Sequence, residues 1–235
     1  IMQTASYTNI FKKASTTYYY SSLFFPASVL EDVTAFYAFV RTADDFVDAI
    51  PQDEAGFTEF VRRYKALRRK SSSKGQAVPT YPIIRSMIAL QKKYAIDNEI
   101  IDSFLDAMQA DLHKSTYKKL SETIAYMYGS AEVIGLVMAH ILKLPKAAYV
   151  TAQMQGRAMQ YINFIRDVAE DNELGRQYIP VDEDAIEVSD IANEVNSAWI
   201  DMEVVSKGHF NEIEGHINSL EKVKREITAF LEIKK

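Results

Sequence analysis

Three oxygen-bearing side chains recur at every fourth residue in one stretch of the chain: Asn163, Asp167 and Asp171. On an α-helix, residues at i, i+4 and i+8 lie along one face, about 6 Å apart per step. Carboxylates at this spacing repel one another unless a cation or an arginine neutralises them. Apolar residues between them indicate that the helix also has a buried side. The stretch therefore predicts one wall of a cation-binding site.

A second acidic set follows Arg41, with Asp44 and Asp48 on one helical face and Asp45 about 100° round. Taken alone, such a set is more often the solvated end of a helix. The two sets share a pattern, however, because each places aspartates at i and i+4 on an apolar helix with an arginine within one turn. If the two helices face each other, their oxygens converge on a hard cation such as Mg²⁺, and the arginines bind phosphate oxygens.

Other metal and partner classes fit less well. A di-iron carboxylate bundle also uses acids on facing helices, but it requires Glu-x-x-His, and none of the four histidines has Glu three residues before it. The chain has no cysteine, which excludes a disulfide framework and thiol catalysis. A net charge of −5 argues against nucleic acid as a partner. No secretory signal is visible, and the longest apolar run, residues 133–142, is too short to span a bilayer.

Helical periodicity runs through the chain and strand alternation does not, so we expect an all-α protein of one domain over its 235 residues. Helix boundaries are predicted from capping residues, prolines and Gly175. The predicted helices are 28–50 with a Ser28/Glu31 capping box, 57–69, 83–94, 99–113 capped by Asp97, 122–142 capped by Ser121, 146–174 stopped by Gly175, 192–205 and 213–230, with an exposed connection at 69–82.

Taken with their neighbours, the two acidic sets resemble the motifs of the squalene/phytoene synthase family. Three further segments resemble that family's pattern and occur in the expected order between about Phe11 and Pro180. The matching residues are Ser15-Thr-Thr17-Tyr18, Arg41-Thr-Ala-Asp44-Asp45-Phe-Val-Asp48, Asp111, Tyr126-Met-Tyr-Gly129-Ser-Ala131-Glu-Val-Ile-Gly135, and Gln160, Asn163, Arg166, Asp167, Asp171, Gly175, Arg176, Tyr178 and Pro180.

The resemblance implies a helical bundle of the isoprenoid synthase type, enclosing a central cavity, with a C-terminal end at Lys235 that is shorter than usual. It implies Mg²⁺-dependent (or Mn²⁺-dependent) head-to-head joining of two prenyl diphosphates through a cyclopropylcarbinyl diphosphate. The segment around Tyr126 looks most like phytoene synthases, which favours two geranylgeranyl diphosphates and carotenoid biosynthesis. Squalene or dehydrosqualene synthesis from C15 substrates is the alternative, with NADPH needed only for squalene. A non-catalytic binding or assembly homologue is the alternative of another class.

By position, the resemblance implies roles for individual residues. Metal binding falls to Asp44, Asp48, Asn163, Asp167 and Asp171, and catalysis to the four aspartates of this set with Tyr126. Diphosphate or substrate binding falls to Ser15, Thr17, Tyr37, Arg41, Gln160, Arg166, Arg176 and Tyr178. As structure alone, Arg176 and Tyr178 are a helix C-terminal cation and a packing aromatic. Glu132 departs from the family, which commonly has glycine there. We expect a cytoplasmic protein that makes transient contact with a membrane surface while it handles its apolar substrates.

Overall fold

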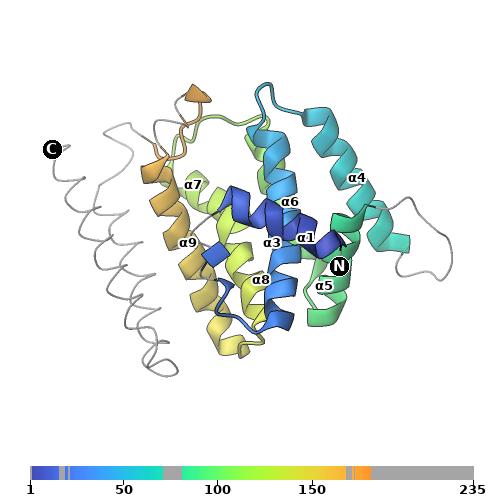
Figure 1. The fold of residues 1–235 in the computed structure, drawn as a ribbon. Helices are drawn as coiled ribbons and strands as arrows, with labels where there is room; N and C mark the ends of the chain where they lie inside the picture. Colours follow the sequence, from blue (N-terminus) through green and yellow to red (C-terminus); the bar gives the residue numbers. More distant parts are fainter. Residues whose placement is uncertain are drawn as a thin grey trace. The chain divides into compact units, whose positions relative to one another are not determined.

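The computed structural model describes residues 2–15, 19–20, 22–70, 81–167, 171 and 173–180 (Figure 1). Within these ranges every regular element is a helix, which confirms the all-α expectation, and one isolated parallel bridge joins Thr116 to Gln177. The helices expected at 192–205 and 213–230 lie outside the described residues. Backbone contacts divide the chain into two compact units, residues 1–114 with 136–145 and residues 115–135 with 146–235.

The first unit is built around one long helix, which is contacted by four others (Figure 1). Phe39 on this helix packs against Phe60 and Phe104, with ring centroids 5.2 and 6.4 Å apart. Phe39 is fully buried, so the core of the unit lies along this face of the central helix. The central helix is α3 (Ala27–Asp48), and its neighbours are α1 (Met2–Ala14), α4 (Glu54–Lys70), α5 (Pro82–Tyr94) and α6 (Asn98–Asp111).

Two helix starts in this unit differ from the prediction. The capping box at Ser28 is wrong, because α3 begins at Ala27 with Pro26 as its N-cap residue and no side-chain cap bond. Pro26 has φ −52° and ψ 145°, so its ring fits the extended residue before the helix, and it has no side-chain oxygen to cap α3. Asp53 is a side-chain cap that was not predicted, since its Oδ1 accepts a hydrogen bond of 2.8 Å from the backbone N–H of Gly56 in α4.

The second unit contains a helical stretch interrupted by a π turn, followed by a second long helix. The predicted N-cap Ser121 is wrong, because the helix begins at Leu120 after Lys119, and no side chain caps it. The π turn brings an extra residue into the helix, which hydrophobic periodicity does not reveal. The elements are α7 (Leu120–Met127), the π-helical η1 (Tyr128–Glu132), α8 (Val133–Ile141, whose second part belongs to the first unit), η2 (Lys146–Ala148) and α9 (Tyr149–Arg166).

α9 ends at Arg166 and Asp167 is a turn, whereas Asp171 and Glu173, within the stretch predicted to be helical to about residue 174, are helical. Asp167, the C-cap residue of α9, has φ −96° and ψ 10°. The helical conformation at Asp171 and Glu173 ends at the predicted glycine: Gly175 has φ +68°, and the N–H of Arg176 donates to the carbonyl of Asp171 at 2.7 Å. A positive φ at this point suits glycine, so Gly175 is confirmed as the stop signal.

Helix α9 packs very closely on η1 at Gly156. A Cβ atom added to Gly156 would lie 2.4 Å from the carbonyl oxygen of Ala131. Replacing Gly156 by alanine should therefore lower the free energy of unfolding by about 1–3 kcal/mol, because backbone must move to make room. Denaturant unfolding measures the change. The exposed neighbour Gln155, changed to alanine, is the control, and equal stability of the two variants would contradict the close packing.

One helical stretch among the described residues, Leu120–Ile141, is long and apolar enough to cross a membrane by length and composition. Half of its most apolar window is buried inside the protein. A core helix passes the same test, so this single stretch is weak evidence for a membrane span.

Candidate functional site

The first acidic motif forms a polar stripe along α3. Tyr37, Arg41, Asp44 and Asp48 follow one another at steps of four, three and four residues, which places them on one face of the helix. The guanidinium of Arg41 donates from Nη1 to Asp44 Oδ2 and from Nε to Asp45 Oδ1, both at 2.7 Å. The predicted proximity of Arg41 to both acids is thus confirmed, and this arginine is already oriented by carboxylates on its own helix.

The carboxyl of Asp44 has a strongly raised pKa. Burial raises the pKa of its carboxyl from near 3.8 to about 7, and the negative charges of Asp48, Asp111 and Asp45 add to the effect. Arg41 opposes the shift without cancelling it. Asp111 is buried at the end of α6, so carboxylates from two helices act on Asp44. The first unit therefore holds an excess of negative charge that a divalent cation would neutralise.

This excess charge has a consequence for stability without metal. A carboxyl whose pKa is higher in the folded state than in the unfolded state costs stability as the pH rises between the two values. Ionisation of Asp44 should accordingly make the metal-free protein less stable as the pH rises from about 4 to about 7. Asp44→Asn should remove part of this loss and raise the free energy of unfolding at pH 7.5 by about 1 kcal/mol, since a third of the side chain is exposed and screened. Urea unfolding of the wild type and of Asp44→Asn, at pH 5 and pH 7.5 in the presence of chelator, measures both effects. An Asp44→Asn protein that is less stable than the wild type at pH 7.5 would contradict the prediction.

Three residues in the first part of the chain are predicted to bind substrate: Tyr37, Ser15 and Thr17. Tyr37 lies one turn before Arg41 on α3. Tyr37 is half-buried, and its ring stacks on Phe11 of α1 at a centroid distance of 4.1 Å. Ser15 directly follows α1, and its backbone N–H donates to the carbonyl of Phe11 at 3.0 Å. Thr17 lies outside the described residues. The contact between Phe11 and Tyr37 joins the end of α1 to the helix that carries Arg41.

The second acidic motif lies at the end of α9, in the second unit. The N–H of Asp167 donates to the carbonyl of Asn163, and the N–H of Asp171 donates to the carbonyl of Asp167, both at 2.8 Å. Both are i to i+4 backbone hydrogen bonds of the helical type, as the predicted spacing of four residues requires. Asn163 Nδ2 donates to Gln160 Oε1 at 3.2 Å, and the exposed Arg166 binds Asp167 with distances of 2.6 and 2.5 Å.

Tyr178 is held in an aromatic cluster of the second unit. Its ring stacks on Phe164 of α9 at 4.7 Å and on Tyr126 of α7 at 5.1 Å. Its carbonyl accepts a buried hydrogen bond of 2.6 Å from the hydroxyl of Thr123. The bridge between Thr116 and Gln177 fixes the same segment, in which Arg176 is also buried. Tyr126 and Tyr178, far apart in the sequence, are thus brought together as packing aromatics.

The residues predicted to bind metal and diphosphate are divided between the two units. Arg41, Asp44 and Asp48 belong to the first, whereas the motif of Asn163 and Asp167 belongs to the second. The expectation that the two motifs face each other stays a prediction. Among the described residues, no three histidine or acidic side chains already form a metal site. The donor set itself fits Mg²⁺, because it is made of oxygen ligands with unbalanced negative charge at Asp44.

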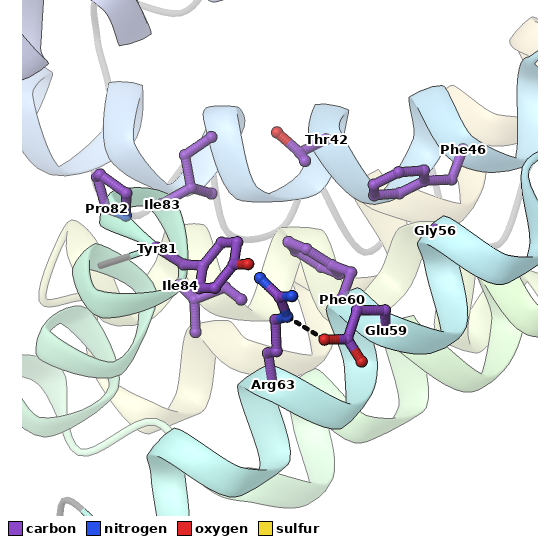
Figure 2. A pocket seen from close by; sticks show the side chains of 10 residues that line it. All are labelled: Thr42, Phe46, Gly56, Glu59, Phe60, Arg63, Tyr81, Pro82, Ile83 and Ile84. Carbon is purple, nitrogen blue, oxygen red and sulfur yellow. Dashed lines mark hydrogen bonds and ion pairs between the residues drawn. The ribbon is translucent and has the colours of Figure 1, made fainter. Parts of the chain in front are cut away.

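The hollow in Figure 2 is separate from this stripe. It has a volume of about 320 Å³ and lies between α3, α4 and the start of α5. Thr42 and Phe46, which line it, lie roughly 160° round α3 from Asp44 and Asp48. The charged residues that line it are Arg63 and Glu59, which form an ion pair. The guanidinium of Arg63 also stacks on Tyr81, with its Cζ 3.9 Å from the ring centroid. The acidic stripe does not open into this pocket.

A charged pair that was not predicted lies in the second unit. Glu132 is 3% exposed, and its Oε1 accepts a hydrogen bond of 2.6 Å from Nε of Arg157. Arg157 lies one turn before Gln160 on α9. The glutamate was noticed only as a departure from a common glycine, and nothing in the local sequence indicates its partner 25 residues away.

Comparisons with known proteins agree with these motifs. The family model for squalene/phytoene synthase matches residues 11–223. The chain is 28% identical to a phytoene synthase from Rhodobacter capsulatus over 176 residues, which is 74% of this chain and 50% of that protein. It is 27% identical to the 15-cis-phytoene synthase of Enterobacter agglomerans, covering 68% of this chain and 56% of that protein. It is 26% identical to the 4,4'-diapophytoene synthase of Staphylococcus haemolyticus, covering 72% of this chain and 59% of that protein.

Solved structures show the same fold. A dehydrosqualene synthase bound to a ligand superposes with a TM-score of 0.71 at 21% identity, covering 97% of this chain and 96% of that one. The squalene synthase HpnC from Alicyclobacillus acidocaldarius superposes with a TM-score of 0.75 at 17% identity, covering 100% and 96%. In the sequence alignments, the chain spans about half the length of the relatives it matches. With a family model that covers most of its length and the family's motifs on α3 and α9, the chain belongs to the squalene/phytoene synthase family.

Proposed function

We propose that the protein joins two prenyl diphosphates head to head in a Mg²⁺-dependent reaction. The observation that carries the proposal is the stripe of Arg41, Asp44 and Asp48 on α3, in which burial and neighbouring acids raise the pKa of Asp44 to about 7. Such an arrangement is costly without a cation and suited to one. The family of the chain supports the type of reaction.

The chain's own residues would bind and orient the diphosphate groups. Asp44 and Asp48 in the first unit, and Asn163, Asp167 and Asp171 in the second, would supply oxygen ligands for Mg²⁺, which would neutralise charge on the leaving diphosphate. Arg41 and Arg166, each paired with a neighbouring aspartate, present guanidinium N–H groups to phosphate oxygens. We include Arg176, Ser15 and Thr17 as substrate ligands on the resemblance alone.

The aromatic residues would protect the cation left behind. Loss of diphosphate from an allylic carbon produces a carbocation that water would trap. The rings of Tyr126, Phe164 and Tyr178 form a buried apolar cluster, which would help to exclude water in the second unit. Gln160, which accepts a hydrogen bond from Asn163, would link the reacting end to the metal ligands.

For the substrate, we propose two geranylgeranyl diphosphates, which are joined through a cyclopropylcarbinyl diphosphate to give phytoene. Two of the relatives, at 28% and 27% identity, are phytoene synthases. The second candidate is farnesyl diphosphate, favoured by the 4,4'-diapophytoene synthase at 26% identity. The apolar tails also favour transient contact with a membrane surface.

Mass spectrometry of the products shows which of the two prenyl diphosphates is the substrate. The protein is incubated with C15 and C20 diphosphates side by side, with and without NADPH. We expect a C40 hydrocarbon from the C20 substrate that does not depend on NADPH. A C30 product alone would replace phytoene by dehydrosqualene, or by squalene if NADPH is required. No product from either substrate would favour a non-catalytic member of the family.

A further inference from the structure

Gln52 joins the ends of two helices that carry the acidic residues of the first unit. It lies in the connection between α3 and α4. Its side-chain nitrogen Nε2 donates to the carbonyl of Val47 at 2.8 Å and to the carbonyl of Asp111 at 3.0 Å. An amide NH₂ group has two protons, so both bonds form at once. Val47 is in the last turn of α3, and Asp111 is the last residue of α6.

The two bonds fix the separation of the helix ends. Both carbonyl oxygens bind one nitrogen atom, so they lie within about 6 Å of each other. Both carbonyls lie in the last turn of their helices, where the helix dipole is negative. Gln52 therefore supplies one shared donor to the negative ends of α3 and α6.

The same helix ends hold the carboxylates of the candidate metal site. Asp44 and Asp48 are in the last two turns of α3, and Asp111 ends α6. The charges of Asp48 and Asp111 both act on Asp44, which places the three carboxyl groups in one electrostatic neighbourhood. Gln52 binds backbone carbonyls instead of these carboxylates, so it can hold them together without competing with a cation for their oxygens.

We propose that Gln52 is a positioning residue that keeps the ends of α3 and α6 at the separation at which the acidic cluster binds a divalent cation together with diphosphate. The role rests on the proposed function. Partners that orient metal ligands from behind typically change metal affinity by tenfold or more when they are removed. The turn between α3 and α4 would then serve the site although it contains none of the ligands.

The test replaces Gln52 by methionine, which has similar length and no N–H donor. The matched control is Gln109→Met, at an exposed position near the end of α6. Binding of Mg²⁺ in the presence of inorganic diphosphate is measured by calorimetry and by the Mg²⁺-induced rise in the thermal midpoint. The Mg²⁺ concentration for half-maximal turnover and the KM for the prenyl diphosphate are measured in parallel.

We expect Gln52→Met to need about tenfold more Mg²⁺ for half-saturation, with an unchanged KM at saturating Mg²⁺, and Gln109→Met to match the wild type. A Gln52→Met protein that binds Mg²⁺ as the wild type does overturns the assignment, even if its metal-free thermal midpoint is lower, because the residue is then only structural. A wild-type protein that binds no Mg²⁺ with diphosphate overturns the proposed function as well.

Discussion

Replacement of Asp44 by asparagine should reduce the rate of prenyl diphosphate condensation by about a hundredfold to a thousandfold. The amide keeps the shape of the side chain but removes the charge on which a metal ligand depends. The metal-free variant is expected to be at least as stable as the wild type, so we expect the loss of activity without unfolding. Steady-state turnover with Mg²⁺ measures the effect, and circular dichroism verifies the fold.

The control for this variant is Asp106→Asn, an exposed acid on α6 away from the end of the helix. Its turnover should equal that of the wild type. Asp167→Asn tests the second motif and should lose as much activity as Asp44→Asn. If Asp44→Asn kept more than about a tenth of wild-type turnover, its assignment as a ligand would be wrong.

Breaking the buried pair of Glu132 and Arg157 should have the largest effect on stability. Replacing Arg157 by methionine leaves the carboxylate of Glu132, 3% exposed, without its closest cation. An uncompensated buried charge costs about 3–5 kcal/mol. The free energy of unfolding, measured in urea at pH 7.5, should fall by this amount.

The double variant Glu132→Leu/Arg157→Met distinguishes charge from packing. Replacing both partners by apolar residues removes the unpaired charge, so the double variant should be more stable than Arg157→Met alone. Arg62→Met is the control, because its pair with Glu59 is exposed to solvent and should contribute little to stability. Equal stability of the single and double variants would show that burial of the charge is not the cause.

Local spacing predicted the helices and the contacts within them. The contacts of Arg41 with Asp44 and Asp45 depend only on steps of three and four residues along α3, and the structure contains both. Gly175 was predicted as a stop because few residues adopt its positive φ. Hydrophilic capping residues were less reliable: the helices at Ala27 and Leu120 begin without a side-chain cap bond.

Contacts between distant segments were not predictable in the same way. Gln52 and Asp111 are 59 residues apart, and Glu132 and Arg157 are 25 residues apart. No periodicity joins such pairs, and each depends on how two helices pack. The π turn of residues 128–132 was also missed, because it changes the backbone bonding and leaves the apolar pattern intact. Tyr178 packs as an aromatic, as its structural reading predicts, since its ring stacks on Phe164; its role in diphosphate binding stays a prediction.

Diphosphate release tests the central claim most directly. The purified protein is incubated with geranylgeranyl diphosphate and Mg²⁺, and both inorganic diphosphate and hydrocarbon are quantified. Head-to-head joining through a cyclopropylcarbinyl diphosphate predicts two diphosphates released per C40 product, and no release when a chelator removes Mg²⁺. Undiminished release in chelator, or release of diphosphate without a carbon–carbon bond between two prenyl chains, would contradict the assignment of the aspartate motifs to a metal-dependent condensation.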